Sequence, residues 1–355
     1  MKHQFKPINR ACLLVAMASA AVCAHADVTI GGVFDVGYVS DKTPGLTTKK
    51  VDGSLSDLTR IVINGDVALK NGVKAIFTVE SDFFNPGSKS SNTGSFANGE
   101  VQAGLTGGFG TIQAGRVNTA TFFNTLFYQP YGTAIGSAFG SYTNGVVRYD
   151  NSAKYTTPSL NGLKASLLFS AKNPNSTDDA KNTSGVTEFG LSYNNGPLSV
   201  GFANLKSEIV ANASGNGNND PFANLGATKE YVVNSLGASY SVGKGLKLMA
   251  LMDSQKADSG AKERTHTALS AVYVTGQNQF SGTVGTFKDK TPDAAATGSS
   301  AVYTTLGYDY FLDDKATSAV YVRHTSTDDK TLRYGGAATY AGTYSTVAVG
   351  YRFAF

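Results

Sequence analysis

Three arginines, Arg60, Arg116 and Arg148, are the residues of this 355-residue sequence whose type and position could carry chemistry. A guanidinium group is permanently charged and binds carboxylates and other anions through paired hydrogen bonds. Apolar and polar side chains alternate around Arg60, which places it on a polar face with Asn64. Alternation likewise places Arg148 on a polar face, beside Asp150, with Val147 and Tyr149 on the outward, apolar face. The pattern predicts fixed positive charges facing water.

Arg116 does not follow the same rule. Strict alternation from Ile112 and Ala114 places it on the apolar face, which is costly for a charge. The strand is expected to end at Arg116, so a bend into the next connection can turn the side chain to the polar face. Lys74 and Lys154 fall on polar faces by alternation and extend the positive set.

The sequence offers few residues for catalysis or for binding a metal or a phosphate. Beyond the first 26 residues the chain has two histidines, His266 and His324, and no cysteine. The two histidines lie in separate segments without the spacing of metal ligands. The glycine-rich stretch 107–110 precedes a strand pattern, so it is expected to form a turn and not a phosphate loop. We therefore predict no catalytic residue, no cofactor and no metal.

The elements that hold these residues are expected to be strands. Forty glycines disfavour a helical bundle, and the 16% of charged residues and many aromatics disfavour disorder. Segments of period two, with one apolar and one polar face, recur along the chain. Clear examples cover 28–38, 73–82, 246–253 and 302–312. The connections alternate between seven short turns and eight long loops, which predicts about sixteen strands. The long loops are expected near 41–56, 85–96, 117–146, 173–185, 209–228, 256–263, 289–299 and 327–341.

An even number of short strands, with short and long connections in alternation, is typical of an antiparallel transmembrane β-barrel. The start of the chain fits export, because basic residues precede an apolar stretch at 11–24 and an Ala-His-Ala cleavage site at 24–26. We predict that 1–26 is a cleaved secretory signal peptide and that 27–355 is one all-β barrel domain. Removal of the signal lowers the net charge from +4 to +1, so the basic balance does not indicate a nucleic-acid partner.

Two further segments suit a barrel. The chain ends with Tyr351, Phe353 and Phe355 on one face, as expected for a closing strand that pairs with the first. The connection 117–147 is long and has no charged residue, so its aromatics are expected to pack against the barrel wall. A surface loop packed on a neighbouring subunit remains the alternative. The aromatics of this loop are Phe122, Phe123, Phe127, Tyr128, Tyr131, Phe139 and Tyr142.

The sequence resembles the Gram-negative general diffusion porins, particularly their betaproteobacterial branch, over essentially all of 27–355. The resemblance implies a water-filled outer-membrane channel for passive diffusion of small hydrophilic solutes and ions. It implies no enzyme activity and a homotrimer of 16-stranded barrels whose third long loop folds inward and narrows the pore. It also implies contact with lipid and lipopolysaccharide, and delivery by periplasmic chaperones and the barrel-assembly machinery. The motifs that carry it are 28–38 (VTIGGVFDVGY), 59–70 (TRIVINGDVALK), 72–82 (GVKAIFTVESD), 109–116 (FGTIQAGR), 148–158 (RYDNSAKYTTP) and 351–355 (YRFAF).

In that family, arginines at the positions matching Arg60, Arg116 and Arg148 form a ladder on the wall facing the inward loop. Many members carry acidic residues on the loop, whereas the loop between Arg116 and Arg148 has none. A net positive constriction and a mild anion preference are therefore expected.

Three alternatives remain from the sequence. A channel specific for a sugar or an anion would use the loop aromatics. A barrel enzyme would need a Ser–His or Asp–His pair built on one of the two histidines. An adhesin would bring a separate domain, and none is visible.

Overall fold

The computed structural model describes residues 26–43, 45–56, 58–83, 96–137, 147–171, 185–208, 230–257, 263–289, 300–329 and 342–355. The predicted signal peptide lies outside these residues, except for Ala26. Nearly every described element is a strand, and each strand pairs antiparallel with its neighbours. The elements are β1 (Ala26–Thr43), β2 (Leu46–Gly53), β3 (Arg60–Ala68), η1 (Lys70–Gly72), β4 (Lys74–Asp82), β5 (Val101–Gly107), β6 (Gly110–Asn118), α2 (Ala120–Phe127), β7 (Arg148–Thr156), β8 (Leu163–Ser170), β9 (Val186–Asn195), β10 (Leu198–Glu208), β11 (Glu230–Val242), β12 (Leu246–Ala257), β13 (Glu263–Thr275), β14 (Asn278–Asp289), β15 (Ser300–Phe311), β16 (Ser318–Asp329) and β17 (Gly342–Ala354).

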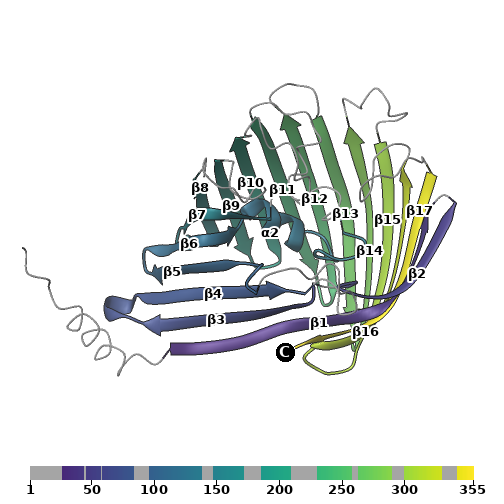
Figure 1. The fold of residues 1–355 in the computed structure, drawn as a ribbon, viewed down its shortest axis with the longest axis horizontal. Helices are drawn as coiled ribbons and strands as arrows, with labels where there is room; N and C mark the ends of the chain where they lie inside the picture. Colours follow the sequence, from purple (N-terminus) through teal and green to yellow (C-terminus); the bar gives the residue numbers. More distant parts are fainter. Residues whose placement is uncertain are drawn as a thin grey trace, which may run out of the picture.

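The sheet closes on itself. Strand β1 pairs with the last strand, β17, from Val33 opposite Ala354 to Lys42 opposite Ser345. Figure 1 shows this seam, with purple β1 alongside yellow β17. Phe355 completes it, because its backbone N–H and C=O each bond to Gly32 at 3.1 Å. The predicted pairing of the last strand with the first is confirmed.

The described strands number seventeen but occupy sixteen positions around the barrel. Strands β2 and β3 both pair with the same edge of β1, β3 with its first half and β2 with its second. They are two parts of one wall position, interrupted between Gly53 and Arg60. The predicted count of sixteen is confirmed, but the long loop expected at 41–56 is wrong. Strand β1 instead turns near Gly45 and returns as β2.

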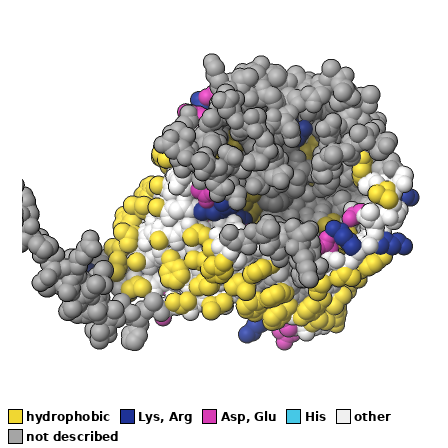
Figure 2. All heavy atoms as spheres, in the orientation of Figure 1, with side chains coloured by type: hydrophobic (Ala, Val, Ile, Leu, Met, Phe, Trp, Pro, Cys, Tyr) yellow, Lys and Arg dark blue, Asp and Glu magenta, His cyan; other side chains and the backbone are white. Residues whose placement is uncertain are grey.

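One face of the sheet is apolar and exposed, and the other is polar. Large side chains such as Phe169, Leu269 and Leu306 are more than half exposed on the outer face. Figure 2 shows hydrophobic side chains as a continuous band across the outer surface on the side of β1. No helix among the described residues is long and apolar enough to cross a membrane. The apolar outer band gives the strands themselves a surface suited to lipid.

A buried polar group joins three strands of the inner face. His266 on β13 is fully buried, with Nδ1 3.1 Å from the Asp253 carboxylate and Nε2 2.9 Å from the Tyr303 hydroxyl. Its ring also stacks on Phe287 at 4.8 Å. These contacts hold β12, β13 and β15 together across the wall.

Replacement of His266 by Phe is expected to destabilise the barrel by about 2–4 kcal/mol, because the buried Asp253 and Tyr303 lose a hydrogen-bond partner. The midpoint of urea unfolding, followed by the gel mobility of the folded barrel, measures this. His324→Phe is the matched control, because His324 lies on an exposed part of β16 and its contact with Ser345 is long, at 3.4 Å. Equal midpoints for the two variants would contradict the expectation.

Candidate pore-lining site

The segment that follows β6 lies against the polar face of the sheet. Thr119 caps helix α2 by accepting a hydrogen bond from Phe122 N at 2.9 Å. The buried Glu188 carboxylate on β9 binds the first turn, accepting from Ala120 N at 2.6 Å and Thr121 N at 2.8 Å. A carboxylate at a helix N-terminus is favoured by both the free N–H groups and the helix dipole. Glu188 therefore fixes where this helix begins.

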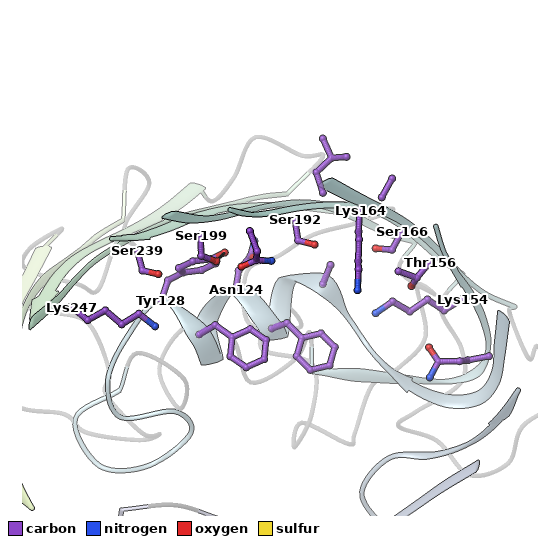
Figure 3. Close-up of a pocket in the computed structure, with 18 residues that line it drawn as sticks. Asn124, Tyr128, Lys154, Thr156, Lys164, Ser166, Ser192, Ser199, Ser239 and Lys247 are labelled. Atoms are coloured by element: carbon purple, nitrogen blue, oxygen red, sulfur yellow. Dashed lines mark hydrogen bonds between the residues drawn. The ribbon is translucent and has the colours of Figure 1, made fainter. Parts of the chain in front are cut away.

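The C-terminal end of α2 is held by two contacts of Tyr128 with the wall. The Tyr128 hydroxyl lies 3.0 Å from Ser199 Oγ on β10. The Tyr128 ring covers Gly237, where an added Cβ would come within 1.9 Å of ring carbon atoms. Asn124 adds a bond to the Ser235 carbonyl at 3.3 Å. The helix thus lies along β9, β10 and β11 (Figures 1 and 3).

After the helix the chain reaches the opposite side of the wall. The Tyr131 hydroxyl donates to the Thr305 carbonyl on β15 at 3.3 Å, and Thr305 Oγ1 donates to Gly136 O at 3.1 Å. Burial raises the pKa of both Tyr128 and Tyr131, so the two phenols stay neutral under ordinary conditions. The described segment 119–137 therefore has hydrogen bonds to β9 near its start and to β15 near its end.

The predicted loop aromatics divide into two groups. Phe122, Tyr128 and Tyr131 are buried against the wall. Phe123 and Phe127 stack on each other, with ring centroids 5.6 Å apart, and Phe127 remains 56% exposed. Phe139 and Tyr142 lie outside the described residues.

Arg148 is the centre of a balanced group of charges. Its Nη1 lies 3.1 Å from Glu80 Oε1 and 3.3 Å from Asp82 Oδ2, and all three side chains are largely buried. Arg60 lies opposite Asp82 in the register of β3 and β4. Arg148 is therefore paired with two carboxylates. The acids come from β4, and not from the loop.

Arg116 lies at a β-bulge and pairs elsewhere. The register between β6 and β7 shifts between Gly115 and Val117, so Arg116 lies at an irregularity inside the strand. The strand continues to Asn118 and does not end at Arg116 as expected. The Arg116 guanidinium nevertheless pairs with Asp150 at 3.1 Å, and not with the carboxylates that bind Arg148. Asp150, which alternation places beside Arg148, is thus the partner of Arg116.

Tyr149 also departs from simple alternation. It packs against the buried cluster of Val117 and Leu168 on the inner face, and its hydroxyl lies 3.0 Å from that of Tyr231. The expected outward direction of Tyr149 is wrong. The physical reason is the bulge in β6 together with the positive φ of Asn151 in β7.

The two predicted pore lysines, Lys74 and Lys154, lie in different parts of the barrel. Lys74 pairs with Asp66 at 2.7 Å at the end of β4 next to the short turn η1. Lys154 is buried at the base of the helix, where Nζ donates to Asn118 O at 2.9 Å. Its Nζ also lies 5.2 Å from the centre of the Phe123 ring. Of these two lysines, Lys154 therefore lies beside α2 and Lys74 does not.

Three inner-face cations were not among the pore residues predicted from the sequence. Arg323 on β16 binds Asp309 at 2.8 Å and lies against the rings of Tyr131 and Tyr321. Lys164 on β8 and Lys247 on β12 line a cavity of about 640 Å³ between α2 and the wall, together with Lys154. Figure 3 shows Lys154 and Lys164 at one end of this cavity and Lys247 at the other, beside Tyr128. Among the residues that the structure describes, no carboxylate lines it.

Comparison with known proteins places this geometry in a family. The model of the Gram-negative porin family matches residues 11–330. The outer membrane porin protein 32 of Delftia acidovorans is 27% identical over 97% of this chain and 98% of its own length. Among solved structures, the anion-selective porin from Comamonas acidovorans superposes with a TM-score of 0.76 at 23% identity, covering 93% of this chain and all of that one. OmpT of Vibrio cholerae in its trimer form gives a TM-score of 0.66 at 13% identity, covering 93% of this chain and 99% of that one.

Proposed function

The chain belongs to the Gram-negative porin family, and from that premise we propose that its channel passes small anions in preference to cations. The family membership establishes a passive outer-membrane diffusion channel with an apolar band against the lipid. The porins it resembles are channels, not enzymes. The sign of its ion selectivity is a matter of the charges that line the interior.

One observation carries the proposal. Lys154, Lys164 and Lys247 line the space between α2 and the wall, and no acidic residue in the described part of the chain shares that lining. Elsewhere on the inner face, Arg116 and Arg148 are matched by neighbouring carboxylates and contribute little net field. The positive potential therefore comes mainly from the lysines. The Comamonas porin, which is named as anion-selective, has the same fold. This supports the proposal that the present channel also prefers anions.

Charge reversal at Lys164 and Lys247 tests this sign. The wild-type channel in planar bilayers under a KCl gradient is expected to give a zero-current potential that favours chloride. Each lysine changed to Glu is expected to lower the anion-to-cation permeability ratio by about twofold or more, since a unit charge one Debye length from the ion path contributes roughly 0.5 kcal/mol.

Lys244→Glu is the matched control, because Lys244 lies in the exposed turn before β12, three residues from Lys247, and does not line the cavity. A cation-favouring wild-type potential would refute the anion preference. Equal effects of Lys244→Glu and Lys247→Glu would show that the field is not local to the cavity.

We also propose that the third loop folds inward and narrows this channel. The bonds of segment 119–137 to both β9 and β15 support this. A homotrimer is proposed as the assembled form, because OmpT of Vibrio cholerae, a protein of similar fold, has a trimer form. Conductance steps that close in threes, together with the mass of the detergent-solubilised complex, test the trimer.

We also propose that the signal peptide is cleaved after Ala26. The N-terminal sequence of the protein purified from outer membranes is expected to begin at Asp27.

A further inference from the structure

The cavity between α2 and the wall combines cations with aromatic rings. Lys154, Lys164 and Lys247 line it together with Phe123, Phe127 and Tyr128. We propose that this cavity is a binding site for organic anions that carry an aromatic ring, with aromatic carboxylates as the class that fits it. The proposal rests on the proposed function, since it names the solute class for the same lysines.

The lysines have capacity to bind a carboxylate. Neither Lys164 nor Lys247 forms an ion pair within the described residues. Lys154 uses one N–H on the Asn118 carbonyl and has two more. The nearby Glu188 is occupied, because its two oxygens accept from the first turn of α2.

The rings lie next to the charges. Phe123 has the Lys154 ammonium 5.2 Å from its ring centre and Phe127 stacked on it at an angle of 7°. A carboxylate bound at Lys154 or Lys164 carries its own ring to the edge of this pair. Aromatic pairs add about 0.5–1.5 kcal/mol beyond simple burial, and an aliphatic acid such as acetate lacks this contact.

Hydroxyl groups line the wall between the charged ends. Ser166 and Thr156 lie near Lys154 and Lys164, and Ser192 and Ser199 lie along α2 toward Tyr128 (Figure 3). Hydroxyls donate hydrogen bonds to carboxylate oxygens without adding charge. A cavity of about 640 Å³ is within the usual range for small-molecule sites. The cavity lining is therefore apolar at the aromatic rings, cationic at both ends and polar along the wall between the ends.

Benzoate and acetate are the probes for the test, each added to single channels of the full protein at constant ionic strength and chloride activity. Benzoate is expected to lower the chloride conductance along a saturating curve, and acetate is not. Lys164→Gln, Lys247→Gln and Phe127→Leu are each expected to raise the half-blocking benzoate concentration by about threefold or more. Lys244→Gln is expected to leave it unchanged.

Two results would overturn the site: equal, non-saturating effects of benzoate and acetate, or a Lys244→Gln shift as large as that of Lys247→Gln. The zero-current potential distinguishes a failure of the binding site from a failure of the proposed anion preference. Saturating benzoate block in a cation-favouring channel contradicts the anion preference and supports the site. An anion-favouring channel without saturating block contradicts the site alone.

Discussion

Deletion of Phe355 is expected to reduce the yield of folded barrel by about tenfold or more. Its backbone N–H and C=O make the last pair of hydrogen bonds of the seam, both to Gly32 at 3.1 Å. Its ring stacks between Phe34, at 6.1 Å, and Phe353, at 5.9 Å. A barrel in lipid cannot leave a strand edge unpaired, so loss of the last residue weakens closure itself.

The gel mobility of unheated outer-membrane samples measures this yield, because a folded barrel and a denatured chain migrate differently. Phe355→Tyr keeps the ring and the backbone bonds, so it is the matched control and is expected to fold at close to the wild-type level. Normal folding of the deletion variant would show that the described pairing between β1 and β17 is sufficient without the terminal ring.

The strands could be predicted because lipid and water impose opposite demands on the two faces. Each strand between the membrane boundaries must alternate, and that period predicted the strands. The count of sixteen came from the alternation of short and long connections. Strand β2 escaped prediction because Leu46–Gly53 is polar and mostly exposed on both faces. A strand with water on both sides has no alternation to detect.

The site was harder to predict than the wall. Alternation correctly placed Lys247 on a polar face, but nothing in the sequence shows that α2 lies opposite it. The partners of Arg148 depend on which strands are neighbours, and Glu80 lies 68 residues away. The positive φ of Asn151 and the bulge after Gly115 shift the pattern by one residue, which is why Arg116 and Tyr149 departed from it.

Replacement of Glu188 by Ala is expected to detach the first turn of α2 and to make the open-channel current unsteady. The carboxylate is 1% exposed and also accepts from Thr121 Oγ1 at 2.8 Å. Without it, two N–H groups and a hydroxyl inside the barrel lose their acceptor, at a cost of about 3 kcal/mol. The contacts of Tyr128 and Asn124 remain, so the helix stays tethered at its far end while its start moves into the lumen.

Single-channel recordings measure this as excess open-channel noise and a conductance that differs from wild type, and urea unfolding measures the loss of stability. Glu188→Gln keeps the shape but turns one acceptor into a donor facing an N–H group, so it is expected to behave like Glu188→Ala. Glu230→Gln is the matched control, because Glu230 forms an exposed pair with Lys206 at 2.8 Å and is expected to change stability by less than about 0.5 kcal/mol. Quiet currents of wild-type size in both Glu188 variants would mean that Tyr128 and Asn124 hold the helix without the carboxylate.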